Sequence, residues 1–464
     1  GGSSFAYDLW QERHHGRGPR EEAQATGEMR FLVGLDLSEG QEGLSDTLVS
    51  LGRAHSGVTI ACLGGPGLPE LAVPSSPFWL CALRPGDELA PGAFASYAAA
   101  ARHSDEAIIY ADDDLQDDGG RRHSPHFKPD WNPELYRWHD FLSHSSLVRI
   151  DDPAELAEVA ERPDWLEILI GRWIGAQIDS VAHIPQLLHH RRARPSPRLP
   201  EAMTSDASPN DLPTVTAIVP TRNRVDLLQN CIAGLRNTHY PRLDIIIIDN
   251  DSDDPATLAY LRDIAGEQCR ILPYHGPFNY AAMNNEAARM ATGDLLCFLN
   301  NDIEMLDTDW LSHMARQAVR PTVGAVGARL LYGDGSIQHA GVVIGVGGGA
   351  AHAPRNLHPK DSGYYSRHNL PQFTNAVTAA CLVVQRDRFL AVGGFDPIHF
   401  PVAFNDVDLC LRLNQQGWQS LYEPRATLVH HESKSRGKDS HRANRDRFAK
   451  ELSALKARWH TQTV

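Results

Sequence analysis

The stretch Leu-Cys-Phe-Leu-Asn-Asn-Asp at residues 296–302 decides the fold expected for this chain. Four apolar residues run directly into two amides and a carboxylate. In an open α/β sheet, ligands bind outside the carboxyl ends of the strands, so these polar side chains are expected at a binding edge. Asp302 could hold a divalent cation there, because hard cations combine few protein carboxylates with substrate phosphates. A turn or a helix cap is the structural alternative for a single Asp after a strand.

Apolar strands alternate with amphipathic helices around this stretch. Residues 244–249 contain four consecutive isoleucines, a run that is apolar on both faces, as a central parallel strand requires. Alternating strands and helices predict βαβ units. We therefore predict an α/β fold with a mostly parallel sheet and helices on both faces. The expected strands are 215–219, 244–249 and 294–299, and the expected helices are 224–235, 256–265, 279–291 and one that begins at 405.

The composition is that of an ordinary globular protein, with 42% hydrophobic and 22% charged residues. A formal net charge of −14 argues against a general nucleic-acid binder, because neutralising phosphates needs an excess of Lys and Arg. We expect no transmembrane segment and no secretory signal, since no apolar run approaches about 18 residues. Seven cysteines without CxxC pairs indicate reduced thiols.

The length of 464 residues predicts two domains. Residues 191–212 carry four prolines among small polar residues without apolar periodicity, which is typical of a linker. The linker would separate a domain at 31–190 from a second domain at 213–440. We expect residues 1–30 to be a tag scar and an N-terminal segment, and residues 441–464 to form a C-terminal helix.

The N-terminal half resembles a damaged copy of the C-terminal half. Its expected strands are 31–37, 58–63, 78–83 and 107–110. Residues 80–88 align with 296–304, and residues 183–190 align with 422–431. In this alignment Gly86 corresponds to Asp302, and Arg84 corresponds to Asn300. The predicted metal-binding carboxylate is therefore absent from the first copy. Two short matches can also arise by chance.

Polar residues follow two further expected strands at the same edge. The loop after the first strand could seat a nucleobase, and an Asp after the second could accept hydrogen bonds from a uracil or thymine N3–H or from ribose hydroxyls. A helix cap and an Asx turn are the structural alternatives. The predicted nucleotide-binding residues are Pro220, Thr221, Asn223, Asp249, Asn250, Ser252, Asn284, Asn300, Asn301, Lys434 and Arg436.

Two further segments could carry catalysis and metal binding. Asp406 and Asp408 stand in the first turn of an expected helix, where acidic residues are common caps. In the functional interpretation Asp406 is a general base, and Asp408 is a second acid or pairs with Arg412. His430 ends an apolar strand and could complete a Mn²⁺ or Mg²⁺ shell, with Lys434 and Arg436 on phosphate oxygens. A basic surface loop is the alternative for this last segment.

Together these motifs resemble the family 2 glycosyltransferases of GT-A fold, in particular the rhamnosyltransferase-like members of bacterial O-antigen and surface-polysaccharide pathways. The matching segments are residues 219–224, 248–252, 278–285, 298–304, 338–343, 378–384, 392–396, 404–412 and 430–437. Residues 110–114, 127–131 and 183–185 resemble the first domain of two-domain relatives. The resemblance implies two tandem GT-A-like domains, the first of them degenerate and non-catalytic.

The resemblance also implies a chemistry. The donor would be dTDP-rhamnose or a UDP-sugar, and the acceptor a hydroxyl of a glycan or lipid-linked glycan. Asp302 and His430 would hold Mn²⁺ or Mg²⁺, and Asp406 would be the base of an inverting transfer. This chain has Asn300 where many relatives have Asp, which weakens metal binding only if both acids are needed. It has Asn405 where many have Glu, which leaves the base in place.

Such an enzyme is expected in the cytoplasm, or peripherally on the cytoplasmic face of the inner membrane. Two other functions fit an α/β nucleotide edge. A sugar-1-phosphate nucleotidylyltransferase normally needs a Gly-rich phosphate loop after the first strand, and residues 220–224 lack the glycines. A non-catalytic carbohydrate-binding or scaffold subunit would not need Asp302, Asp406 and His430 together.

Overall fold

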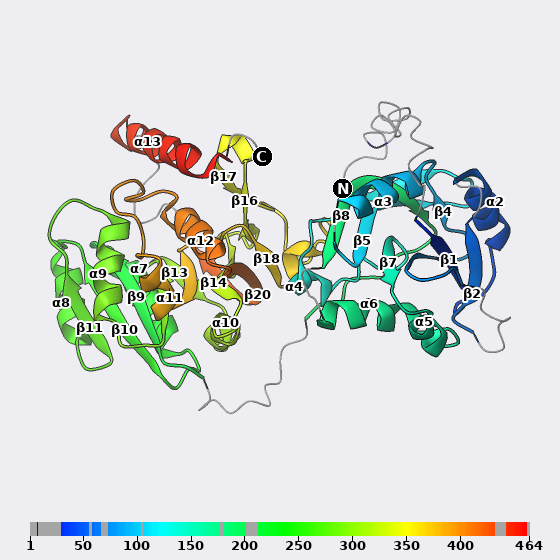
Figure 1. Ribbon diagram of the computed structural model, residues 1–464. Coiled ribbons are helices and arrows are strands. Elements are labelled where there is room, and N and C mark those ends of the chain that lie inside the picture. Colours follow the sequence, from blue (N-terminus) through cyan, green and yellow to red (C-terminus); the bar gives the residue numbers. More distant parts are fainter. Residues whose placement is uncertain are drawn as a thin grey trace. The chain divides into compact units, whose positions relative to one another are not determined.

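The computed structural model describes Tyr7 and residues 29–54, 58–65, 73–103, 105–176, 180–200, 212–431 and 442–461. The chain divides into two compact units, Gly1–Arg198 and Leu199–Val464. Each unit contains a large sheet with helices packed against it (Figure 1). In the described part of the chain, we find no helix with the length and apolar character needed to cross a membrane.

The second unit is built on a ten-stranded sheet with the order β11-β10-β9-β12-β19-β14-β20-β13. Strands β9 to β12 pair in parallel, and β19 then runs antiparallel to both β12 and β14. The strands are β9 (Val215–Thr221), β10 (Leu243–Asp249), β11 (Cys269–Pro273), β12 (Leu295–Leu299), β13 (Ile303–Met305), β14 (Val323–Leu331), β15 (Ile337–His339), β18 (Gln372–Thr374), β19 (Cys381–Gln385) and β20 (Gln419–His430). A separate hairpin consists of β16 (Val342–Ile344) and β17 (Ala350–His352).

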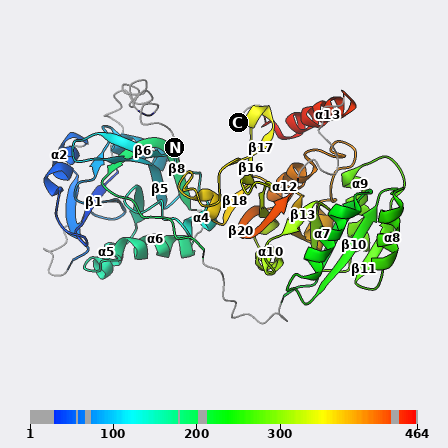
Figure 2. The same cartoon turned by 180° about the vertical axis from the view of Figure 1, so that it is seen from behind.

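Helices cover both faces of this sheet, as the sequence predicts. Alternate residues of a strand point to opposite faces, and two hydrophobic cores result. One core joins Cys297 to helices α7 and α8 and to α10, and the other joins Phe298 to α9, α11 and α12. The helices are α7 (Val225–Arg236), α8 (Pro255–Ile264), α9 (Tyr280–Met290), α10 (Trp310–Ala318), α11 (Arg386–Ala391), α12 (Asn405–Gln415) and α13 (Arg442–Trp459). Figure 2 shows α8 beside β11 at the outer edge of the sheet.

The first unit has an eight-stranded sheet with the order β2-β1-β3-β7-β5-β8-β4, and β6 pairs with β5. Its strands are β1 (Phe31–Asp36), β2 (Thr59–Leu63), β3 (Phe78–Leu83), β4 (Glu88–Leu89), β5 (Ile108–Gln116), β6 (Arg122–His126), β7 (Ser146–Ile150) and β8 (Val181–Arg191). Its helices are α2 (Leu44–Ala54), α3 (Ala93–Arg102), α4 (Pro133–Tyr136), α5 (Pro153–Val159) and α6 (Trp165–Ala176).

The two sheets share one strand arrangement. When β11 is set aside, β2-β1-β3-β7-β5-β8-β4 corresponds to β10-β9-β12-β19-β14-β20-β13. Each pair of neighbours has the same relative direction in both units, for example parallel for β5 and β8 as for β14 and β20. One extra strand also corresponds, because β6 pairs with β5 as β15 pairs with β14, whereas β18 on β20 has no counterpart among the described strands of the first unit. This shared order is far more extensive than the two short sequence matches.

Three details differ from the expectations. Strand β9 continues through Pro220, because β12 pairs with β9 only as far as Ile218 and the missing N–H of Pro220 faces no partner strand there. Strand β5 extends through three aspartates that the sequence pattern excludes from a strand. It does so because each carboxylate has a buried partner: Asp113 binds Lys128 at 2.9 Å, Asp112 binds His183 at 2.9 Å and Asp114 binds His190 at 2.6 Å.

The start of the predicted linker is also part of the first unit. The backbone N–H of Arg192 donates to Asp87 at 2.9 Å, and the Arg194 guanidinium binds the buried Asp113. Residues 191–194 are therefore held by buried carboxylates that need counter-charges. The proline-rich composition does not reveal these contacts.

Candidate active site

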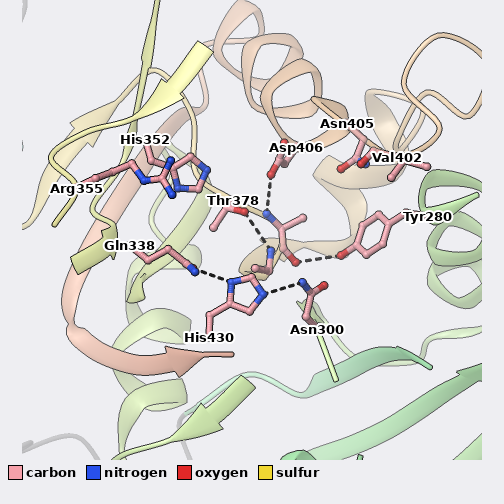
Figure 3. A pocket seen from close by; sticks show the side chains of 12 residues that line it. Tyr280, Asn300, Gln338, His352, Arg355, Thr378, Val402, Asn405, Asp406 and His430 are labelled. Carbon is pink, nitrogen blue, oxygen red and sulfur yellow. Dashed lines mark hydrogen bonds between the residues drawn. The ribbon is translucent and has the colours of Figure 1, made fainter. Parts of the chain in front are cut away.

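A pocket opens at the carboxyl edge of the second sheet and collects three of the predicted site residues. Asn300 follows β12, Asp406 begins α12 and His430 ends β20 (Figure 3). The other polar side chains around it are Tyr280, Gln338, His352, Arg355, Thr378 and Asn405. The sequence motifs thus converge in space although 130 residues separate Asn300 from His430.

Antiparallel pairing of β13 with β20 brings Asp302 next to His430. Ile303 pairs with His430, and the His431 N–H donates to the Asp302 carbonyl at 3.0 Å. The Asp302 Oδ1 then lies 3.3 Å from the His430 Nε2. The Asn300 amide nitrogen is also 3.3 Å from this Nε2. Asp302 is buried, so its carboxylate is held in a site that excludes most water.

The donor set of Asp302 and His430 fits a small divalent cation. Two ligands in cis positions about 2.1 Å from an octahedral ion lie roughly 3.0 Å apart, close to the 3.3 Å between Asp302 Oδ1 and His430 Nε2. The described residues contain no cluster of three or more His, Cys, Asp or Glu side chains that could hold a metal. A cation here would therefore depend on water and substrate oxygens for its remaining ligands, as Mg²⁺ commonly does.

Gln338 orients the His430 ring. The Gln338 Oε1 is 2.7 Å from the His430 Nδ1, and an amide oxygen can only accept, so the proton is placed on Nδ1. The other ring nitrogen, Nε2, then faces Asp302 and Asn300. Such a partner on the far ring nitrogen is the usual arrangement behind a metal-binding histidine. The sequence analysis quoted Gln338 only as part of a motif and assigned it no role.

Asp406 lies at the opposite wall of the pocket. It is half-buried in the first turn of α12, and its Oδ2 accepts from the Ala379 N–H at 3.0 Å. Tyr280 donates through its hydroxyl to the Ala379 carbonyl at 3.0 Å, which fixes the same loop from the other side. Asp406 is thus placed as a fixed carboxylate that faces the pocket.

Asp408 has a different role from the one predicted as a second acid. It is fully buried. Its Oδ2 accepts from Arg412 at 2.8 Å, and its Oδ1 accepts from Arg458 at 2.8 Å and from the Trp459 indole at 3.0 Å. The pairing with Arg412 is confirmed, and Asp408 does not line the pocket. Because α12 turns by about 100° per residue, positions 406 and 408 point to different surroundings.

Only some of the residues predicted to bind the nucleotide come together at the carboxyl edge of the sheet. The Asn301 amide donates to the Thr221 hydroxyl at 3.0 Å, and the Asn250 N–H donates to the Thr221 carbonyl at 2.9 Å. These bonds join the ends of β9, β10 and β12 at one edge. The Asp249 Oδ1 accepts from the Ser252 N–H at 3.1 Å and the residue is half-buried, as in an Asx turn. Pro220 is buried inside β9.

Three of the residues predicted to bind the nucleotide form hydrogen bonds to other residues of the protein. The Asn223 amide bonds the Asp253 side chain and the N–H groups of residues 253 and 254, and its own N–H donates to the Ser252 hydroxyl at 2.9 Å. Asn284 is fully buried in α9, and its amide donates to the Tyr280 carbonyl at 2.8 Å. These side chains fix loops and a helix. Contact of Asn284 with a nucleotide stays a prediction. Lys434 and Arg436 lie outside the described residues.

His352 lines the remaining wall and packs against the buried His339. The Nδ1 atoms of His339 and His352 are 3.2 Å apart, and their rings meet edge to face. Burial, with the neighbouring His352 and His430, holds the pKa of His339 well below its usual range, so this ring is neutral. His352 and Arg355 were missed by the sequence analysis, because no pattern around them indicates a site.

Comparisons with known proteins agree with this geometry. Residues 216–344 match the family model described as glycosyl transferase family 2. An uncharacterized protein of Sinorhizobium fredii is 37% identical over 404 residues, which cover 77% of this chain and 44% of that protein. The O-antigen biosynthesis protein RfbC of Myxococcus xanthus is 35% identical over 394 residues, which cover 76% and 31%.

A third relative is covered over most of its own length. The N-acetylglucosaminyl-diphospho-decaprenol L-rhamnosyltransferase of Mycobacterium tuberculosis is 28% identical over 232 residues, which cover 46% of this chain and 74% of that protein. The chain spans less than half the length of the first two relatives.

Proposed function

We propose, for a chain that belongs to glycosyl transferase family 2, that the second unit transfers a sugar from a nucleotide-sugar donor to a hydroxyl of a glycan or lipid-linked glycan, with inversion. One observation carries this proposal: Asp406 faces the pocket that also contains His430, and His430 lies against Asp302. A single displacement needs a base at the acceptor oxygen and positive charge at the departing diphosphate. The pocket offers groups for both.

In this reaction the acceptor oxygen forms a bond to the anomeric carbon while the bond from that carbon to the diphosphate oxygen breaks. Asp406 takes the acceptor proton, and the nucleoside diphosphate leaves with the electron pair. Asp302 and His430 would hold Mn²⁺ or Mg²⁺, with Gln338 orienting His430. When bound, the cation supplies charge neutralisation for the diphosphate.

The edge formed by Thr221, Asp249 and Asn301 is our proposed nucleoside site. An Asp carboxylate accepts from uracil or thymine N3–H or from ribose hydroxyls, which favours a UDP- or dTDP-linked sugar. The rhamnosyltransferase and O-antigen names of the relatives support dTDP-rhamnose and a surface-polysaccharide acceptor.

The first unit is proposed to be a non-catalytic copy. Gly86 and Asp302 each lie three residues beyond the end of the corresponding strand, β3 or β12. A Cβ at Gly86 would meet the Arg192 side chain at 2.8 Å, so an arginine occupies the space of a metal-binding carboxylate. At the end of β1, Asp36 is bonded to His144 at 2.8 Å, and Arg84 lies 3.9 Å away. Protein side chains thus occupy the edge where a nucleotide would lie.

The test is incubation of the full chain with Mn²⁺ or Mg²⁺ and a panel of UDP-, dTDP- and GDP-sugars. Release of nucleoside diphosphate from one donor, accelerated by a glycan acceptor, is the expected result. A nucleotidylyltransferase would instead release pyrophosphate from a nucleoside triphosphate and a sugar 1-phosphate. A carbohydrate-binding scaffold would bind glycan and turn over no donor, and either outcome would overturn the proposal.

A further inference from the structure

The C-terminal helix α13 packs against α12, the helix that carries the proposed base (Figures 1 and 2). Leu455 is fully buried and belongs to the same hydrophobic core as Phe400, Val407 and Leu409. The helix is therefore docked on the catalytic unit by apolar packing, although it lies beyond the residues that match the family model.

A buried carboxylate of α13 holds the segment that leads into α12. Glu451 is 2% exposed, and its Oε2 accepts from the N–H groups of Val402, at 3.2 Å, and Ala403. The residue that precedes α12, Phe404, is left-handed and provides no side-chain cap. Glu451 thus holds, from another helix, two backbone N–H groups of the segment that leads into α12.

The C-terminal end of α13 binds α12 on the other side of Asp406, at Asp408. Arg458 and the Trp459 indole both donate to the Asp408 Oδ1, at 2.8 and 3.0 Å. Arg458 also binds Asp396 at 2.8 Å. In the sequence, Asp406 lies between these two attachment points. It follows Val402 by four residues and Ala403 by three, and it precedes Asp408 by two. Val402 lines the pocket, whereas Glu451, Arg458 and Trp459 do not.

The same helix reaches the opposite wall of the pocket. The hydroxyl of Thr461, just past its end, donates to the Gly348 carbonyl at 3.0 Å, and Leu452 packs against Gly349. These glycines connect β16 to β17, and β17 ends at His352, which lines the pocket. One helix therefore contacts both the element that carries Asp406 and the hairpin that carries His352.

We propose that α13 positions Asp406 for proton transfer, with Glu451 as the positioning residue on the N-terminal side. This inference rests on the proposed glycosyl transfer. A misplacement of a reacting group by about 1 Å can cost roughly 10²-fold in rate even when the mutated residue is remote. Donor binding should be spared, because neither attachment of α13 reaches Asp302, Thr221 or Asp249.

The experiment compares Glu451→Ala, Glu451→Gln and the control Lys450→Ala in the full chain. Lys450 is exposed on the same helix. Glu451→Ala is expected to lower kcat about 10- to 100-fold, while KM for the donor and nucleotide affinity stay within about 3-fold. Glu451→Gln retains an oxygen that can accept both N–H groups, so it should restore most of kcat. Lys450→Ala should match wild type.

Trp459→Phe serves as the second variant if Glu451→Ala does not fold. It removes one donor to Asp408 and keeps the ring, and a lower kcat with unchanged donor KM is expected. Wild-type kcat in Glu451→Ala or, if that variant does not fold, in Trp459→Phe would overturn the inference. The inference would also be overturned if Glu451→Ala and Glu451→Gln lost the same amount of kcat and both losses accompanied a lower melting temperature. A wild-type chain that turns over no donor would instead overturn the proposed function itself.

Discussion

Replacing Asp406 and Asp408 by Asn should separate catalysis from stability within one helical turn. Asp406 is half-buried and faces the pocket, whereas Asp408 is fully buried and accepts from Arg412, Arg458 and Trp459. First-turn carboxylates are usually exposed and contribute only about 0.5 kcal/mol through the helix dipole, which would leave stability nearly unchanged in both variants. The burial of Asp408 reverses that expectation for this one residue.

The magnitude for Asp408→Asn follows from its buried charges. Removing one partner of a buried, hydrogen-bonded ion pair costs about 3–5 kcal/mol, because an uncompensated charge stays behind. At roughly 2–4 °C per kcal/mol for a domain of this size, Tm should fall by about 6–20 °C. Transfer below the new Tm should fall much less than in Asp406→Asn.

For Asp406→Asn the expected effect is kinetic. The amide keeps an oxygen for the Ala379 N–H, and the lost interaction with the helix dipole is worth only about 0.5 kcal/mol. Without the base, transfer should fall by roughly 10²- to 10⁴-fold at unchanged nucleotide affinity.

Thermal melting, single-turnover transfer and nucleotide titration on both variants decide the question. The reasoning would be refuted if Asp408→Asn melted like wild type and were inactive while Asp406→Asn transferred normally. That result would move the base two residues along the helix.

Three further predictions concern the metal and the first unit. Asp302→Asn should abolish Mn²⁺ binding in a calorimetric titration and metal-dependent transfer, whereas the exposed control Asp263→Asn should keep both; retained Mn²⁺ binding would remove Asp302 from the metal site. Gln338→Leu should raise the Mn²⁺ concentration needed for half-maximal activity by about 10- to 100-fold, as loss of a partner behind a metal-binding histidine does. Gln338→Glu keeps an acceptor for His430, so it should not raise this Mn²⁺ concentration. The same Mn²⁺ requirement in both variants would contradict the role of Gln338. Titration of the full chain with UDP or dTDP plus Mn²⁺ should give one site per chain, and a second micromolar site would show that the first unit binds nucleotide.

Local pattern was enough to identify most elements of the second unit and the edge at which its polar residues gather. The isoleucine run became β10, and the predicted helices at 224–235 and 279–291 correspond to α7 and α9. These segments were predictable because hydrophobic periodicity reports which faces will be buried. The α/β fold is confirmed, and residues 216–344 match the model of glycosyl transferase family 2. The position of Asp302 after an apolar strand likewise placed it at the carboxyl edge before any contact was known.

Contacts between distant segments were decided only by the tertiary structure. The pairing of β13 with β20 set Asp302 against His430, and the docking of α13 buried Asp408. The three aspartates of β5 lie in a strand only because side chains from other segments bind their carboxylates. Nothing in the neighbouring residues encodes such partners, since the energy of a buried polar group depends on what the fold brings to it from elsewhere in the chain.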